Sequence, residues 1–328
     1  MNSHDSHERP ARQALAVLER LEQLEGQVCV FGSLNADLTV ETQRLPDPGE
    51  TVTGGDLQVL PGGKSANQAV TAGLLGAPTV ILGAVGDDAH GRLLVESLGG
   101  AGVDTSHVRV EPEVPTGTAI ITVDAEGENS IVVSPGANGR LTGADVRAWA
   151  PQIESADVLG LCLEVAVDSV AEAARTARAA GVKTVLNVSP AQKLPPGLLA
   201  DIDVLIVNEH ELATLADGHV DPLDERAVAA AVARLGVSDL VVTLGGAGSV
   251  VHTIDGAVSV PTFPVAPVDT TGAGDSFMGT LLAALASRVP LAQGAVLASA
   301  VSALATTSLG AQASYADAAR VRDYLGGL

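Results

Sequence analysis

The fold is decided by the stretch VLGLCLEVAVDSVAEAARTARAAGVKTVLN, residues 158–187. It opens on a continuous apolar run at 158–161, passes through a helical pattern at 167–179, and ends on a second apolar run at 184–187. Short apolar runs without alternation are typical of strands that are buried on both faces of a parallel sheet. The stretch therefore predicts a strand–helix–strand unit of an α/β fold.

The same alternation extends in both directions from Gln27. Further strands are expected at 28–32, 79–83, 204–207 and 240–244, a hairpin at 248–260, and helices at 65–75, 90–98, 224–235, 274–286, 291–306 and 315–325. Repeated strands and helices predict a doubly wound, mainly parallel sheet flanked by helices.

Two stretches rich in Thr and Val, at about 36–60 and 114–134, do not fit this alternation. The first is broken by Pro46, Pro48 and Gly49, which favours short strands over a helix. We expect the two stretches to pair as a small β-sheet lid near the carboxyl ends of the main strands, where open α/β sheets bind ligands.

Residues 1–26 are expected to form an N-terminal helical extension to a domain at 27–328. Leu15, Leu18, Leu21 and Leu24 recur every third residue among charged side chains. This is a helical period, and it predicts a helix that lies on the surface or contacts another subunit.

Composition excludes several classes of partner. The 328 residues carry 18 Lys and Arg against 39 Asp and Glu, a formal charge of −21, so we expect no nucleic-acid binding. No apolar run is long enough for a membrane span, and the polar N-terminus lacks a signal-peptide core. Cys29 and Cys162 lie in separate apolar runs, which is typical of buried free thiols. The sequence thus predicts a cytoplasmic protein.

The segment VDTTGAGDSF, residues 268–277, carries the clearest chemical signal. Small residues precede a helix, so several backbone N–H groups can point at one anion, and Asp275 lies in the first turn. The segment has two interpretations: an ordinary acidic helix cap, or an anion hole beside a carboxylate that accepts a hydroxyl proton.

Two other glycine-rich segments are less specific. TLGGAG at 243–248 follows a strand, as many glycine turns do, and PGGKSAN at 61–67 opens a helix. The latter is not a Walker A loop, because Gln58 stands where its first glycine is required. The Rossmann fingerprint is also missing after the first strand, which argues against an NAD-dependent dehydrogenase.

The segments 62–67 and 269–275, in this order and about 200 residues apart, together resemble the two signatures of the pfkB-type carbohydrate kinases, the ribokinase-like family. The resemblance extends from about Val28 to the C-terminus. Residues 32–37, 48–52, 127–129 and 310–312 are similar to the members that act on ribose. The resemblance implies an ATP-dependent kinase that converts ribose to ribose 5-phosphate.

The resemblance also implies roles for individual residues. Asp275 would be the general base, and the amides of Gly272, Ala273 and Gly274 would form the anion hole. The sugar would be bound by Asn35, Asp37, Gly62, Gly63, Lys64, Asn67, Glu164 and Asp275. ATP would be bound by Asn208, Thr243, Leu244, Gly245, Gly246, Ala247, Gly248, Gly274, Asp275 and Ser299. Glu211 would orient Mg²⁺ through water, and K⁺ would be held by Asp269, Thr271, Ala305, Ser308, Gly310 and Ser314.

Two positions depart from the family pattern. Ser65 stands where ribose kinases usually have Gly, and Ser299 stands where relatives carry Asn or His beside the adenine. Deoxyribose, fructose or a nucleoside remain alternative substrates, although three Phe, two Tyr and one Trp offer little for a base-binding slot. A sugar-binding protein without catalysis is a further alternative. By resemblance, the lid is expected to form the contact of a homodimer.

Overall fold

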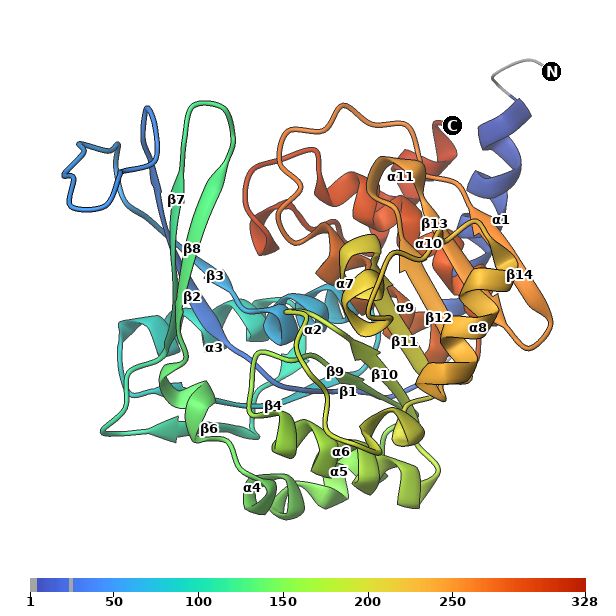
Figure 1. Cartoon of the computed structure of the whole chain (residues 1–328), viewed down its shortest axis with the longest axis horizontal. Coiled ribbons are helices and arrows are strands. Elements are labelled where there is room, and N and C mark those ends of the chain that lie inside the picture. Colours follow the sequence, from blue (N-terminus) through green and yellow to red (C-terminus); the bar gives the residue numbers. More distant parts are fainter. Residues whose placement is uncertain (1–4, 24–25) are drawn as a thin grey trace.

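The computed structural model describes residues 5–23 and 26–328 (Figure 1). These residues form a ten-stranded main sheet and a separate four-stranded sheet, which confirms the predicted α/β fold. The main sheet contains β1 (Val28–Phe31), β4 (Thr79–Gly86), β5 (Val103–Asp104), β6 (Val108–Glu111), β9 (Val158–Leu161), β10 (Lys183–Asn187), β11 (Val204–Asn208), β12 (Asp239–Thr243), β13 (Ser249–Thr253) and β14 (Gly256–Val260).

The order of the strands places a switch point in the middle of the main sheet. The order is β14-β13-β12-β11-β10-β9-β1-β4-β5, and β6 also pairs with β4. The pairs from β12 through β5 and β6 are parallel, whereas β13 and β14 are antiparallel. Because β1 lies between β9 and β4, the chain leaves β1 on one side and later returns on the other. Open α/β sheets bind ligands beyond the carboxyl ends at such a point.

Alternate residues of each main strand pack against helices on opposite faces. In β1, Val28 and Val30 join one buried cluster, while Cys29 and Phe31 join the other. One face is covered by α1 (Asp5–Leu21), α2 (Lys64–Leu74), α3 (Ala89–Gly100), α9 (Ala273–Ala286), α10 (Leu291–Ala305) and α11 (Ala318–Gly326). The other is covered by α4 (Gly143–Ala148), α5 (Ala150–Glu154), α6 (Val167–Ala180), α7 (Glu209–Leu215) and α8 (Glu225–Leu235). Among the described residues, no helix has the length and apolar character needed to cross a bilayer.

The smaller sheet is the predicted lid, and Figure 1 shows it projecting from one side of the main sheet. It contains β2 (Asn35–Glu41), β3 (Gln58–Gly62), β7 (Gly117–Val123) and β8 (Asn129–Ser134) in the order β3-β2-β7-β8. Strands β2 and β7 pair in parallel, so the two Thr/Val-rich stretches do form one sheet. Because only three residues separate β1 from β2, the smaller sheet is joined directly to the switch point.

The elements that the sequence did not predict are short. They are β5, β6, α4, α5 and α7, and the longest of them has seven residues, too few for a periodic pattern to stand out. The last helix begins at Ala318 and not at residue 315, because the Asp317 side chain caps it by accepting from the Arg320 N–H. Residues 312–314 form a separate 3₁₀ turn.

The helix α1 forms as its period predicted, with polar residues such as Arg12 and Gln13 exposed. Its apolar face packs against the domain, because Ala14, Val17 and Leu18 are buried in the same cluster as α9, α10 and α11. Leu24, the last residue of the predicted period, lies outside the described residues. The helix α10, which is rich in Ala, packs against α1 and covers its apolar face. The helical period alone did not show that this contact would lie within the domain.

We expect α1 to stabilise the domain. Leu18→Ala should lower the free energy of unfolding by about 2–5 kcal/mol, since Leu18 is fully buried and truncation leaves a cavity. Leu15→Ala, at a partly buried position on the same helix, is the matched control and should cost less. Urea unfolding measures both. Equal losses at the two positions would contradict the packing described for α1.

Candidate active site

Three segments meet beyond the carboxyl ends of β1 and β9. Glu164 follows β9, and its Oε2 accepts hydrogen bonds from Ser33 Oγ (2.6 Å), the Lys64 N–H (3.0 Å) and Asn35 Nδ2 (3.5 Å). Asn35 is fixed from its other side, because its Oδ1 accepts from Asn138 Nδ2 at 2.8 Å. The structure therefore brings together residues from the first strand, the glycine segment and β9, as the resemblance implied.

The Gly62-Gly63 segment needs its glycines for close approach. Gly63 has φ +88°, and a Cβ there would lie 2.6 Å from the Asn35 backbone nitrogen. At Gly62, a Cβ would overlap the Asp37 carboxylate. The absence of two side chains thus lets α2 begin directly beside Asn35 and Asp37.

Asp275 joins this group from the opposite sequence end of the domain. It lies in the first turn of α9 and is only 8% exposed. Its Oδ2 accepts from Asn67 Nδ2 at 3.0 Å, and its Oδ1 accepts from Gln68 Nε2 at 3.4 Å. Two amides of α2 therefore hold the carboxylate that the sequence singled out as a general base.

The charges of the group shift one another's protonation. Burial, together with the nearby Glu164 and Asp275 carboxylates, raises the pKa of the Asp37 carboxyl to about 7 against the opposing effect of Lys64. Burial also raises the pKa of Asp275, while the Lys64 charge and the Asn67 hydrogen bond act in the opposite direction. The Asp275 carboxylate raises the pKa of Lys64, which therefore stays a cation although it is largely enclosed.

The turn before α9 has the geometry expected for an anion site. Gly272 has φ +75°, and a Cβ there would collide with the Tyr315 hydroxyl. In the described part of the chain, the Gly272 and Gly274 N–H groups have no acceptor, and the dipole of this 14-residue helix adds partial positive charge. The Ala273 N–H differs from the expectation, because it donates to the Thr270 carbonyl at 3.2 Å.

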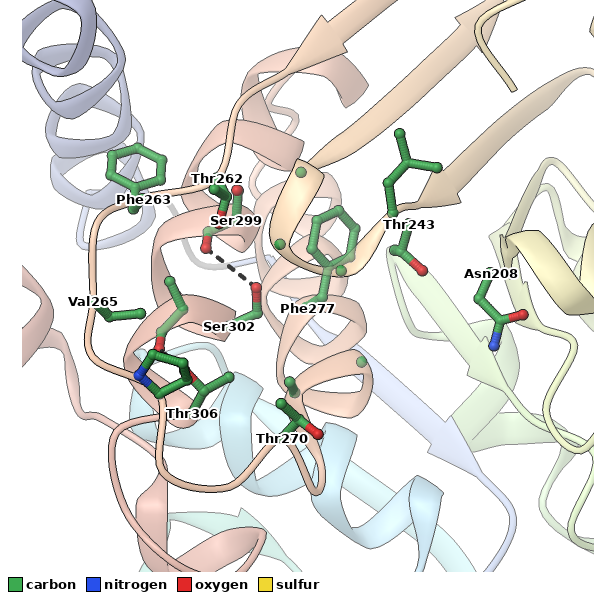
Figure 2. Close-up of a pocket in the computed structure, with 18 of the residues that line it drawn as sticks. Asn208, Thr243, Thr262, Phe263, Val265, Thr270, Phe277, Ser299, Ser302 and Thr306 are labelled. Atoms are coloured by element: carbon green, nitrogen blue, oxygen red, sulfur yellow. Dashed lines mark hydrogen bonds between the residues drawn. The ribbon is translucent and has the colours of Figure 1, made fainter. Parts of the chain in front are cut away.

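A cavity of about 890 Å³ opens on the other side of this turn (Figure 2). Figure 2 shows Asn208 and Thr243 on one side, Ser299, Ser302 and Thr306 on the other, and Phe277 between them. Ala273 and Gly274 also line the cavity, so the turn separates it from the Asn35–Glu164 group. A volume of this size is typical of a pocket for a nucleotide-sized ligand.

Most residues predicted to bind ATP line this cavity. They are Asn208, Thr243, Leu244, Gly245, Gly246, Gly248, Gly274 and Ser299. Ala247 and Asp275 are not among the lining residues. The Ser299 hydroxyl donates to the Pro261 carbonyl at 2.7 Å, so the polar group that departs from the family pattern already has a partner within the protein.

The sequence missed one wall of the cavity. The loop after β14 contributes Thr262, Phe263, Pro264, Val265 and Pro267, and α9 and α10 contribute Phe277, Ser302, Ala303 and Thr306. The loop has no motif and no periodicity. Its only signal was compositional, since it holds one of the three Phe of the chain.

Glu211 fits an indirect role at a divalent cation. Its Oε2 accepts the Asn208 N–H at 2.8 Å, while Asn208 Oδ1 accepts the Glu211 N–H, so the two residues form the capping box of α7. This pairing fixes the carboxylate beside Asn208, which lines the cavity. Mg²⁺ usually keeps several waters and few protein ligands, and one buried carboxylate suits that preference.

The two segments predicted to hold K⁺ are in contact. The Gly310 N–H donates to Asp269 Oδ2 at 2.8 Å, and the Thr271 N–H donates to Asp269 Oδ1 at 2.9 Å. Ser314 Oγ donates to the Ala311 carbonyl and is fully buried. Within residues 5–23 and 26–328, no three His, Cys, Asp or Glu side chains are grouped to hold a metal. The available donors are hydroxyl and carbonyl oxygens, which suit a hard monovalent cation.

The second departure, Ser65, lies beneath the site. Its side chain is fully buried, and its Oγ lies 3.0 Å from Cys162 Sγ. Burial raises the pKa of the Cys162 thiol to about 11, so the thiol stays protonated. Cys29 and Cys162 are both buried and free, as predicted. The Ser65 hydroxyl is thus engaged by the protein itself.

The raised pKa of Asp37 makes stability depend on pH. A folded-state pKa of about 7, against about 3.9 for an unfolded Asp, means that wild-type stability falls as pH rises between about 4 and 7. Asp37→Asn removes this penalty and should stabilise the protein at pH 8 by up to about 4 kcal/mol, because one pKa unit corresponds to about 1.36 kcal/mol.

Chemical denaturation at pH 8 and pH 4 checks this, and the gain should vanish at the lower pH. Asp56→Asn, at an exposed position before β3, is the control for loss of a surface carboxylate. A gain at Asp37 that is the same at both pH values would contradict the assignment.

Comparison with known proteins identifies relatives of this chain. The family model "pfkB family carbohydrate kinase" matches residues 25–318. The chain is 36% identical to ribokinase of Haemophilus influenzae, in an alignment that covers 87% of this chain and 94% of the relative. It is 33% identical to deoxyribokinase of Salmonella typhi over 91% of its length and 98% of the relative.

The chain also resembles a solved structure. The structure of Arabidopsis thaliana ribokinase complexed with ribose and ATP superposes with a TM-score of 0.84 at 33% identity, covering 92% of this chain and 99% of that one. The family match spans most of the chain and includes the segments 62–67 and 269–275, and thus Asp275. The chain therefore belongs to the pfkB family of carbohydrate kinases.

Proposed function

We propose that the chain transfers the γ-phosphoryl group of ATP to the terminal hydroxyl of ribose. The observation that carries the proposal is the position of Asp275. Its buried carboxylate lies between a polar group suited to a sugar and a nucleotide-sized cavity, at the start of a helix where the Gly272 and Gly274 N–H groups have no acceptor among the described residues. The likeness to ribokinases favours ribose, and the likeness to a deoxyribokinase makes deoxyribose the second candidate.

The sugar is held by groups that suit a polyol without charge. Asn35 and Asn67 offer amide donors and acceptors, while Asp37 and Glu164 offer acceptors; Lys64 balances part of the negative charge. Gly62 and Gly63 let α2 begin directly beside Asn35 and Asp37, which keeps these polar groups together. Several convergent polar groups are needed because each buried hydroxyl loses its hydrogen bonds to water.

Transfer follows from the location of the carboxylate. Asp275 accepts the proton of the attacking hydroxyl, and its raised pKa brings it closer to the operating pH of a general base. The Gly272 and Gly274 amides stabilise negative charge that develops on the phosphoryl oxygens, with Ala273 contributing once its bond to Thr270 is exchanged. Mg²⁺, when bound, would neutralise charge on the phosphates, and Glu211 with Asn208 would orient its water shell.

The nucleotide occupies the cavity of Figure 2. The glycine strip at 245–248 lets the chain approach the phosphates closely. The adenine is bound through apolar walls that include Phe277 and Val265, because the Ser299 hydroxyl is committed to Pro261. In this arrangement, the apolar walls take the place of the polar contact to the base that relatives make at the position of Ser299.

A monovalent cation belongs to the same proposed site. K⁺ is bound by oxygens of Asp269, Thr271, Ala305, Ser308, Gly310 and Ser314. The hydrogen bond from Gly310 to Asp269 already brings the two segments together. Since Thr271 directly precedes Gly272, a cation there stabilises the anion-hole turn without touching either substrate.

The lid is proposed to form a homodimer contact. The strand register places Val59, Leu38, Ile120 and Val132 in one row across the four strands, on the face opposite to Asp37. Ile120 and Val132 are half or more exposed. A second copy that covers this row would remove apolar surface from water.

Binding of ATP and two buried free thiols favour a cytoplasmic location.

Asp275→Ala should lower kcat by about 10²–10⁴-fold, the usual contribution of a general base. A coupled ADP assay with ribose, deoxyribose, fructose and adenosine measures this, and ribose should give the highest kcat/KM for the wild type. The substitution should leave ATP binding intact.

Asp168→Ala is the matched control. Asp168 also lies in the first turn of a 14-residue helix, α6, but its side chain is exposed. Its kcat should equal that of the wild type. An Asp275→Ala protein that is folded and retains more than a third of the wild-type kcat would refute the base assignment.

KCl should activate the enzyme more than equimolar NaCl, because a carbonyl cage matched to K⁺ fits Na⁺ less well. Ser314→Ala should raise the K⁺ concentration for half-maximal activity and leave the maximal rate mostly unchanged. Initial rates at constant Mg²⁺ and ionic strength measure both effects. Equal activation by the two salts would count against the cation site.

A further inference from the structure

The turn between α10 and α11 contacts both halves of the proposed site. It runs from Gly310 to Tyr315 and contains the 3₁₀ turn Gln312–Ser314. It is held in shape from within, since Ser314 Oγ donates to the Ala311 carbonyl at 2.8 Å. At its start, the Gly310 N–H donates to Asp269. Two of its side chains, Gln312 and Tyr315, extend into the site and have no role in the mechanism described above.

Gln312 contacts the sugar side. Its Nε2 donates to Asn67 Oδ1 at 3.0 Å, and its own Oε1 accepts from Ser97 Oγ at 2.7 Å. Ser97, Gln312 and Asn67 thus form a chain of hydrogen bonds in which each side chain donates to the next. The chain ends with Asn67 Nδ2, which donates to Asp275. If the Asn67 amide were reversed, its oxygen would face the Asp275 carboxylate. Gln312 therefore fixes which way this amide points.

Tyr315 contacts the phosphate side. Its hydroxyl donates to the Gly272 carbonyl at 2.9 Å, and the same carbonyl accepts the Ser276 N–H at 2.9 Å. Burial raises the pKa of Tyr315 well above its usual value, and the negative Asp275 and Asp37 raise it further. The phenol is therefore a neutral donor throughout the physiological range. Through this carbonyl it fixes the Gly272–Ala273 peptide, which carries the Ala273 N–H of the anion-hole turn.

We propose that Gln312 and Tyr315 are positioning residues, which hold the sugar-binding amide of Asn67 and the anion-hole turn at Gly272 in one fixed relation. Both contacts come from one short turn, so the turn sets the distance between the hydroxyl to be phosphorylated and the phosphoryl group. Phosphoryl transfer depends mainly on such positioning. This inference rests on the proposed function, and it assigns separate consequences to the two side chains.

Loss of the phenol hydroxyl should affect turnover. Tyr315→Phe removes one hydrogen bond and keeps the ring, so kcat should fall about fivefold while the KM values for ribose and ATP change less than twofold. The chain offers a matched control in Tyr324, the other tyrosine, whose hydroxyl donates to the Pro264 carbonyl at the same distance of 2.9 Å. Tyr324→Phe should leave kcat unchanged.

Loss of the Gln312 amide should affect sugar binding. Gln312→Met keeps the size of the side chain and should raise the ribose KM about tenfold with little change in the ATP KM. In an Asn67→Ala background the same substitution should change the ribose KM less than twofold, because Gln312 acts through Asn67. Ser97→Ala breaks the far end of the chain of hydrogen bonds and should give a smaller increase in the ribose KM.

The six variants and the wild type, each checked for its thermal unfolding midpoint, decide the outcome. A lower midpoint with unchanged kcat in Tyr315→Phe would make the hydroxyl merely structural and would overturn its assignment. Additive effects of Gln312→Met and Asn67→Ala would overturn the other. If the wild type itself phosphorylates no pentose, the proposed function fails; if it does and both variants match it, only this inference fails.

Discussion

The site depends on one hydrogen-bonded carboxylate, Asp275, at the first turn of α9. Asn67 and Gln68 reach it from α2, which is some 200 residues away in the sequence, and thereby tie two helices on the same face of the sheet. A buried carboxylate is costly unless donors compensate for lost water. Here the compensation comes from Asn67 and Lys64, which are proposed to bind the sugar, and from Gln68. Burial of the charge therefore depends on the same residues that form the site.

The fold supplies the remaining geometry through the switch point. Because β1 lies between β9 and β4, the residues that follow β1 and β9 reach the same place, and Glu164 meets Ser33 and Asn35 there. The lid begins at that point too, so the sugar group lies at the base of the smaller sheet. The nucleotide cavity forms separately, between β11, β12 and the helices α9 and α10. The turn at 272–274 lies between the two regions.

Much of this arrangement was readable from the sequence, because apolar runs and glycine segments are local signals. The main strands and the pairing of the two Thr/Val-rich stretches were predicted from these signals, whereas the grouping of Asn35, Asn67, Glu164 and Asp275 was implied by the family resemblance. What was missed depends on contacts between distant segments. The period of α1 showed a helix but not that α10 covers it, and the loop at 262–267 carries no pattern although it lines the cavity. Gln312 belongs to the segment 310–312 that resembles the ribose-acting members, but its contact with Asn67 could not be predicted from that segment. Tyr315 carries no sequence signal, and its contact with Gly272 is visible only in the structure.

The central claim concerns where the phosphoryl group goes, and the product answers it most directly. Phosphorus and carbon NMR of the product formed from ATP and ¹³C-labelled ribose reports which carbon carries the phosphate. The account predicts a phosphate coupled to C5 and one ADP for each sugar phosphorylated, because one carboxylate serves one terminal hydroxyl. Release of inorganic phosphate without a sugar phosphate, or phosphate on another carbon, would contradict it.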